Sequence, residues 1–347
     1  MLRKCRGLSA VRRLDLQCAR PCKIRFDQPE GQVSEERGIL INKKLHGIIF
    51  PGFHFPYSPI RTANAILGKI YRLCFTAYLP IGWKRQMSRI RQAFAALNGE
   101  KALIPYITVG DPDIGATLAI MHSMVENGAD ILELGVPFSD PMADGPVIQR
   151  AAERALANGI SLRDVLDVVR KFRETDTQTP VVLMGYLNPV HKMGYREFAQ
   201  EAAMAGVDGV LTVDSPVETI DPLYRELKDN GVDCIFLIAP TTTEDRIKTI
   251  AELAGGFVYY VSLKGVTGAA SLDTDEVSRK IEYLHQYIDI PIGVGFGISN
   301  AESARKIGRV ADAVIVGSRI VKEIENNAGN EAAVVGALVK ELKDAVR

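Results

Sequence analysis

Short apolar runs recur along the chain from Lys101 to the C-terminus. The eight runs are Leu103–Val109, Ile131–Val136, Val181–Gly185, Gly209–Val213, Cys234–Ile238, Phe257–Val261, Ile290–Val294 and Ala311–Val316. The segments between them place apolar residues at a helical period, as residues 162–172 do. Continuous apolar strands that alternate with helices are typical of a parallel sheet covered on both faces.

Eight such units within about 250 residues predict a (β/α)8 TIM barrel. A doubly wound open sheet is the alternative, but the even spacing of the units favours closure. Ser88–Leu97 predicts an extra N-terminal helix that covers the bottom of the barrel. Several strands are introduced by similar turns, which end in Asp130, Asp208, Asp233 and Asp312.

Residues 1–86 lack this order and have a different composition. They contain 16 Lys and Arg against 5 Asp and Glu, although the net charge of the whole chain is zero. They also hold the only tryptophan and all but one of the five cysteines. We therefore expect no packed fold in residues 1–86, and a catalytic barrel domain in residues 87–347.

Three interpretations of residues 1–86 compete. They could be an Arg-rich, acid-poor targeting peptide, or a basic, disordered interaction tail. Alternatively, they are upstream sequence, and the true product starts at Met87. We favour the third interpretation, because ordered patterning begins at Met87.

The remaining composition narrows the class of protein. The only cysteine of the large part, Cys234, lies in an apolar strand, which indicates a reducing compartment and a cytoplasmic location. No apolar run reaches the ~18 residues of a membrane helix. The first 25 residues lack the apolar core of a signal peptide. The five histidines are scattered without ligand spacing, so we expect no metal.

The candidate chemistry lies in the run from Ile131 to Pro146. Glu133 is in the middle of a strand, and Asp144 follows in a loop rich in Pro and Gly. Side chains alternate along a strand, so Glu133 shares the face of Ile131. Two carboxylates placed in this way can act at two points of one substrate. The alternatives are a structural ion pair for Glu133 and a helix N-cap for Asp144.

Function in a barrel collects at the carboxyl ends of the strands. The residues near these ends are mostly apolar or aromatic, among them Tyr106, Tyr186 and Tyr259, which suits a flat apolar ligand with a polar tail. The alternative for the tyrosines is plain packing, and Asp214 is more typical of a turn.

Three glycine-rich loops follow the last three predicted strands. They contain Gly265–Gly268, Gly295–Ser299 and Gly317-Ser318. Backbone N–H groups at such turns and at helix starts bind phosphate. The alternative is that these glycines only make tight turns.

Together these residues resemble the alpha subunit of tryptophan synthase. The run Glu133-Leu-Gly-Val-Pro-Phe-Ser-Asp-Pro-Met-Ala-Asp144 is close to a signature of that family. Four further motifs follow in the expected order: Pro105–Pro112, Tyr186–Pro189, Gly265–Gly268 and Gly295–Ser299. The resemblance extends from about residue 88 to the C-terminus.

The resemblance implies a retro-aldol cleavage of indole-3-glycerol phosphate to indole and glyceraldehyde 3-phosphate. Glu133 would be the acid–base group, and Asp144 would stabilise positive charge on the indole nitrogen. The other site residues implied are Tyr106, Tyr186, Tyr259, Thr267 and Phe296 for the substrate, and Gly268, Gly297, Gly317 and Ser318 for its phosphate.

The resemblance also implies a partner, because the family works as a heterotetramer of two alpha and two beta subunits. Pyridoxal phosphate is expected on the beta subunit only, so this chain itself is expected to need no cofactor. Neither nucleic acid nor a membrane is expected as a partner.

Three alternatives stay open. Indole-glycerol-phosphate synthase shares the late loops, but it should show a catalytic lysine on a strand, and the nearest here is Lys264, just after the sixth strand. A stand-alone lyase would keep every catalytic residue. A non-catalytic regulatory subunit should have lost Glu133 or Asp144.

Deleting residues 1–86 tests their predicted independence. The melting temperature should change by less than about 2 °C, which corresponds to less than about 1 kcal/mol for a domain of this size. Indole release should also be unchanged. Calorimetry and an indole assay on both proteins decide the matter, and a large loss of either property would show that the segment belongs to the folded enzyme.

Overall fold

The computed structural model describes residues 40–42, 47–49, 88–261, 274–295 and 297–347. The chain divides into two compact units, Met1–Lys84 and Arg85–Arg347. In the first unit, β1 (Leu40–Asn42) pairs with β2 (Gly47–Ile49) in antiparallel fashion. The other expectations for residues 1–86 concern residues outside the described ranges.

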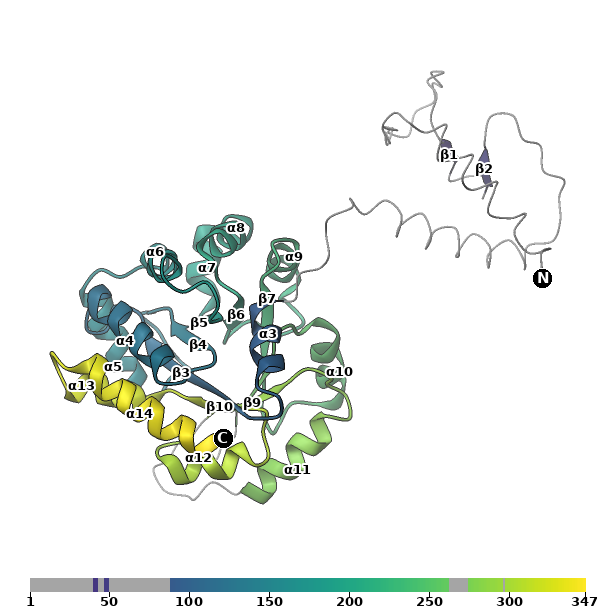
Figure 1. Ribbon diagram of the computed structural model, residues 1–347. Coiled ribbons are helices and arrows are strands. Elements are labelled where there is room, and N and C mark those ends of the chain that lie inside the picture. The colour runs from purple at the N-terminus through teal and green to yellow at the C-terminus, as the bar shows by residue number, and fades with distance from the viewer. Residues whose placement is uncertain (1–39, 43–46, 50–87, 262–273, 296) are drawn as a thin grey trace, which may run out of the picture. The chain divides into compact units, whose positions relative to one another are not determined.

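The second unit is a closed barrel of eight parallel strands, with helices around it (Figure 1). The strands are β3 (Ala102–Thr108), β4 (Leu132–Gly135), β5 (Val181–Gly185), β6 (Gly209–Thr212), β7 (Asp233–Ile238), β8 (Val258–Val261), β9 (Ile292–Gly295) and β10 (Ala313–Val316). Strand β10 closes the barrel on β3, with Ala313 opposite Ala102. The predicted TIM barrel is confirmed, and the open sheet is excluded.

Two strand starts need correction. The predicted eighth strand began at Ala311, whereas β10 begins at Ala313, because Ala311 N still donates to the Ile307 carbonyl oxygen of α12 at 2.9 Å. The predicted seventh strand began at Ile290, whereas β9 begins at Ile292. Pro291 has no N–H to donate to a ladder. Its carbonyl still accepts a hydrogen bond from Val258 N at 2.9 Å, so the proline ends the loop that leads into the strand.

The helices of the second unit follow the predicted alternation. They are α3 (Arg89–Ala96), α4 (Ile114–Glu126), α5 (Pro146–Ala157), α6 (Leu162–Arg173), α7 (Leu187–Met193), α8 (Tyr195–Ala205), α9 (Asp221–Asp229), α10 (Glu244–Leu253), α11 (Thr274–Leu284), α12 (Ala301–Gly308), α13 (Ser318–Asn326) and α14 (Glu331–Val346). Their apolar faces pack on the outward side chains of the strands, such as Leu132 and Leu134. No helix among the described residues is both long and apolar enough to cross a membrane.

A second apolar cluster fills the barrel itself. It contains Ile104, Ile131, Val182 and other inward side chains, together with the fully buried Ile90 of α3. Phe94 of the same helix lies 6.3 Å from the ring of Phe257. Helix α3 therefore closes the bottom of the barrel, as predicted.

Three of the four recurring aspartates before the strands share a role at this amino-terminal end, whereas Asp233 accepts a hydrogen bond from the Ser88 hydroxyl at 2.7 Å. Asp130 accepts a hydrogen bond from Leu103 N at 2.7 Å, and Asp208 accepts one from Val181 N at 2.8 Å. Asp312 binds Ile292 N in the same way, at 2.9 Å. Each of these three carboxylates thus pairs with the N–H at the start of the preceding strand.

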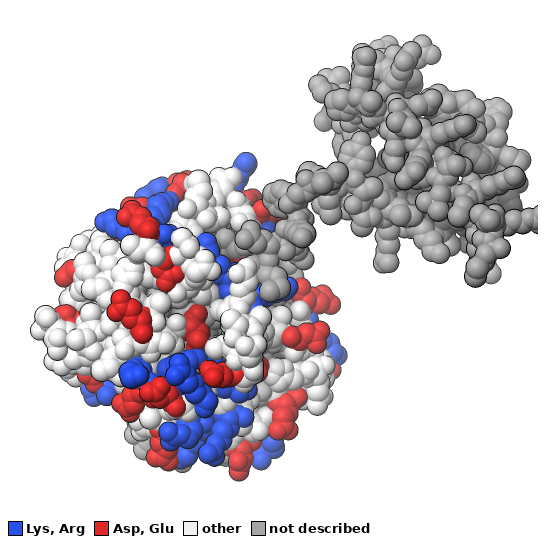
Figure 2. Space-filling view, in the orientation of Figure 1, with Lys and Arg blue, Asp and Glu red and all other residues white. Residues whose placement is uncertain are grey.

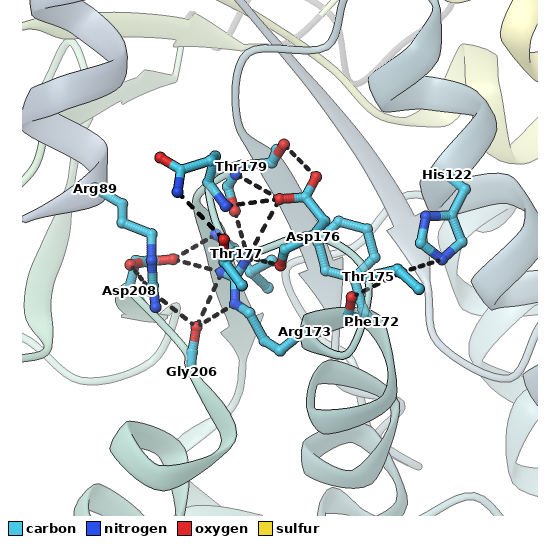
Figure 3. A network of polar contacts seen from close by, with 12 residues as sticks. Arg89, His122, Phe172, Arg173, Thr175, Asp176, Thr177, Thr179, Gly206 and Asp208 are labelled. Atoms are coloured by element: carbon cyan, nitrogen blue, oxygen red, sulfur yellow. Dashed lines mark hydrogen bonds and ion pairs between the residues drawn. The ribbon is translucent and has the colours of Figure 1, made fainter.

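Asp208 also anchors two helices (Figure 3). Arg89 of α3 reaches it at 2.6 Å, and Arg173 of α6 reaches it at 2.8 Å. Arg173 also donates to the carbonyl oxygens of Gly206 and Thr179. Removing one partner of such a buried pair leaves an unpaired charge and typically costs about 3–5 kcal/mol.

Charges of both signs are interspersed on the face of the barrel seen in Figure 2. Many are paired, as Arg163 is with Glu197 and Arg225 with Asp221. Exposed pairs of this kind contribute at most about 1 kcal/mol each, so the fold depends mainly on its buried apolar clusters.

Candidate active site

Glu133 lies inside the barrel on β4, opposite Tyr106 of β3. The neighbouring Leu132 and Leu134 point outward, so the predicted alternation of faces is confirmed. Only 1% of Glu133 is exposed, and neither carboxylate oxygen accepts a hydrogen bond from any residue that the structure describes. Within those residues, the structural ion pair considered for Glu133 is therefore wrong.

Burial without a partner changes the acidity of Glu133. Desolvation, and next the charge of Asp144, raise the pKa of Glu133 to about 8. The group is therefore mostly protonated at neutral pH. A carboxyl group in this state can donate a proton and then take one back.

Asp144 lies in the loop between β4 and α5. Its Oδ2 accepts a hydrogen bond from the Tyr186 hydroxyl at 3.2 Å, and its main-chain oxygen accepts one from Gln149 Nε2 at 2.9 Å. The N-cap residue of α5 is Gly145, so the N-cap role considered for Asp144 is wrong. Burial raises the pKa of Asp144 to about 6, although the bond from Tyr186 opposes this shift.

Tyr186 holds the acidic loop in place. Besides the bond to Asp144, its hydroxyl accepts a hydrogen bond from Ala143 N at 3.0 Å. Its ring stacks on Phe138 with the ring centres 5.1 Å apart. The sequence did not predict this contact of Phe138, because a single aromatic residue in a loop is part of no periodic pattern.

Tyr106 and Tyr259 complete the group around Glu133. The Tyr106 hydroxyl lies 3.4 Å from Thr108 Oγ1 in a buried position. Tyr259 packs against the apolar cluster inside the barrel that contains Ile131. Burial raises the pKa of Tyr259, and the charge of Glu133 raises it further. The structure thus brings together the predicted residues Tyr106, Glu133, Asp144, Tyr186 and Tyr259.

Two glycines make room for these tyrosines. A Cβ atom on Gly135 would lie 2.0 Å from the Tyr106 hydroxyl oxygen, and one on Gly295 would lie 2.1 Å from that of Tyr259. The sequence analysis missed this role of both residues. A glycine inside a predicted strand is a signal for such a close approach.

The predicted phosphate residues that the structure describes lie after β9 and β10. Gly317 is the N-cap residue of α13, and no side chain among the described residues caps this helix. Ile320 N and Val321 N already donate to the Gly317 carbonyl oxygen, at 2.8 and 3.1 Å, so the first-turn N–H groups that lack an intrahelical partner are those of Ser318 and Arg319. Gly297 has a φ of +76°, which favours glycine. Thr267, Gly268 and Phe296 lie outside the described residues.

Other candidates have structural roles. Asp214 Oδ1 accepts a hydrogen bond from Leu187 N at 2.7 Å and so joins the loops after β5 and β6, as expected of a turn residue. The described part of the chain contains no cluster of three His, Cys, Asp or Glu side chains that could hold a metal ion. The site therefore combines a neutral buried acid, a second carboxylate and aromatic walls.

Comparison with known proteins identifies the family. The family model for the tryptophan synthase alpha chain matches residues 93–347. A tryptophan synthase alpha chain of Neisseria meningitidis serogroup A is 97% identical over 261 residues, which is 75% of this chain and all of that protein. The relative from Chromobacterium violaceum is 59% identical over 262 residues, again 75% of this chain and all of that protein.

Solved structures agree with these relatives. The crystal structure of tryptophan synthase subunit alpha from Legionella pneumophila is 44% identical and covers 75% of this chain and 99% of its own, with a TM-score of 0.71. The tryptophan synthase a2b2 complex from Pyrococcus furiosus contains a chain that is 38% identical and covers 70% of this chain and 98% of its own, with a TM-score of 0.64. The chain described here belongs to the tryptophan synthase alpha chain family.

Proposed function

We propose that this chain cleaves indole-3-glycerol phosphate to indole and glyceraldehyde 3-phosphate, as a lyase of tryptophan biosynthesis. The observation that carries the proposal is the buried carboxyl group of Glu133, which has no hydrogen-bond partner among the described residues and whose pKa responds to the charge of Asp144. A retro-aldol reaction of this substrate needs such a pair, because one proton must move twice while a positive charge forms elsewhere.

Glu133 performs the two proton transfers in turn. Its protonated carboxyl donates to indole C3, and the ring becomes a cationic indolenine. The resulting carboxylate then takes the proton from the glycerol hydroxyl next to the breaking bond. As the C–C bond breaks, its electron pair returns to the ring and the hydroxyl carbon becomes an aldehyde, so Glu133 ends protonated again.

Asp144 stabilises the cationic intermediate. A carboxylate beside the indole nitrogen opposes its developing positive charge, and this interaction is strong where water is excluded. Asp144 must therefore be ionised when each turnover begins. Tyr106, Tyr186 and Tyr259 provide aromatic walls for the indole ring, together with Phe296 and Thr267, which lie outside the described residues.

The phosphate binds at the loops after β8, β9 and β10. Gly317 and Ser318 open α13, whose free N–H groups and helix dipole favour an anion. Gly297 and Gly268 contribute further backbone donors. This mode of binding needs no basic side chain.

A beta subunit that carries pyridoxal phosphate is the proposed partner, in a heterotetramer of two alpha and two beta subunits, and this chain needs no cofactor of its own. The loop after β4 offers a contact surface, because Met142 is 81% exposed beside Phe138 and Pro141. Exposed apolar side chains mark interaction sites when they form a contiguous patch, so the neighbouring Phe138 and Pro141 matter to this argument. The buried free thiol of Cys234 fits a cytoplasmic location.

Glu133→Gln should keep the fold and nearly abolish turnover, since an amide cannot carry the proton. General acid–base catalysis is worth roughly 10²–10⁴-fold, and a group that acts in two steps should reach the top of that range. Steady-state indole release measures the loss. Glu174→Gln is the control, because it makes the same change at an exposed glutamate at the C-terminal end of α6. A Glu133→Gln enzyme with more than about a tenth of the normal rate contradicts the assignment.

The two carboxyl groups predict a bell-shaped dependence of kcat/KM on pH. Activity should fall below about pH 6, where Asp144 becomes protonated, and above about pH 8, where Glu133 loses its proton. Asp144→Asn should lower kcat strongly, leave substrate affinity within a few-fold and remove the acidic limb. If the acidic limb persists in this variant, another group produces it.

Gly317→Leu should weaken binding of glyceraldehyde 3-phosphate about tenfold or more, because the side chain would cover the start of α13. Gly317→Ala is the matched control, since a Cβ here makes only ordinary contact, 3.5 Å from Tyr106 Cδ1. Binding of free indole should change little in either variant. Calorimetric titration of each variant gives the affinities for both ligands, and equal losses for the two would argue against a phosphate site.

A further inference from the structure

The loop Gly110-Asp111-Pro112 follows β3 and ends the motif Pro105–Pro112. The proposed reaction assigns no role to these three residues. Asp111 is only 1% exposed. It is paired with Arg154 of α5, which donates from Nε to Oδ1 at 2.7 Å and from Nη2 to Oδ2 at 2.8 Å. Such a two-point pair fixes orientation as well as distance.

The rest of the loop also contacts the C-terminal end of α5. Asn158, the C-cap residue of α5, donates to the carbonyl oxygens of Gly110 and Pro112. Gly110 has a φ of +87°, and a Cβ atom there would lie 2.3 Å from Ile160 Cγ1. The loop therefore holds this end of α5 through both backbone and side-chain contacts.

Arg154 extends the connection to α13. Its Nη1 donates to Glu325 Oε1 at 2.9 Å, and Arg150 binds both oxygens of Glu325 at 2.8 Å each. An apolar cluster of Tyr106, Ala151 and Val321 joins the same three elements, β3, α5 and α13. Polar and apolar contacts thus fix these elements against one another.

The opposite ends of the two helices carry the chemistry. Helix α5 begins two residues after Asp144, and Gln149 in its first turns binds the Asp144 carbonyl oxygen. Helix α13 begins next to Gly317. A hydrogen-bonded helix moves as a unit, so contacts at one end determine where the other end lies. A misplacement of 1 Å in an active site can cost about 10²-fold in rate.

We propose that Arg154 is a positioning residue, which Asp111 and Glu325 hold so that α5 presents Asp144 at the right place relative to Glu133. It acts through Asp144 and touches no substrate. This inference rests on the proposed function.

The test is a double-mutant cycle of Arg154→Gln and Asp144→Asn in the full chain. Arg154→Gln should lower kcat for indole release about tenfold or more, while the affinity for glyceraldehyde 3-phosphate changes less than about threefold. In the Asp144→Asn background, Arg154→Gln should cost less than about twofold, because the group that it places has been removed. Arg154→Lys keeps the charge but not the two-point pair, and it should give an intermediate loss.

Arg173→Gln is the matched control. It also breaks a pair between an arginine and a buried aspartate, but at the amino-terminal end of the barrel, and Arg173 is the more buried of the two arginines, with 10% of its side chain exposed against 33% for Arg154. This variant should lose stability with kcat changed less than about twofold. Equal kcat losses in the Arg154 and Arg173 variants, or additive losses with Asp144→Asn, would overturn the proposal.

Hydrogen exchange separates this inference from the proposed reaction. Amides of residues 143–150 should exchange faster in Arg154→Gln than in the unmodified chain. Their exchange rates should be unchanged in Arg173→Gln. If the unmodified chain releases no indole, the proposed function fails. Unchanged exchange in Arg154→Gln would instead refute the positioning role, whatever the activity.

Discussion

The carboxyl end of this barrel depends on one buried carboxyl group, Glu133, which none of the residues described by the structure hydrogen-bonds. Leaving a polar group in an apolar interior without a donor costs roughly 2–7 kcal/mol, and an ionised one costs far more. Glu133 avoids the larger cost of a buried charge by staying protonated, because its pKa is raised to about 8. A protonated acid at neutral pH is what the proposed reaction requires, so the cost of burial is also the source of reactivity.

The two ends of the barrel divide stability and function between them. At the amino-terminal end, carboxylates are paired: Asp208 with two arginines and Asp130 with Lys343. Aspartates there also bind the first N–H groups of neighbouring strands. At the carboxyl end, Glu133 has no such partner among the described residues. The unsatisfied carboxyl group thus lies at the end of the barrel where the proposed reaction takes place.

The position of Asp144 depends on contacts far from it along the chain. Its loop is held on one side by Tyr186 of the next strand unit, and α5 behind it is held by Asp111 and by α13. Loops tolerate small shifts, and an electrostatic stabiliser does not. A rigid helix anchored at its distal end supplies the accuracy that the loop alone lacks.

The sequence by itself determined the eight-strand barrel, the bottom helix and the inward face of Glu133. These follow from local periodicity, since strands alternate faces and helices repeat every 3.6 residues. Family motifs in the sequence also named Asp144 and the tyrosines. Only the tertiary structure decided that Glu133 has no partner within the described ranges, that Gly135 and Gly295 make space for tyrosine hydroxyls, and that Arg154 pairs with Asp111. These facts depend on contacts between residues distant in the chain, and no local pattern encodes which side chain fills or leaves a given space.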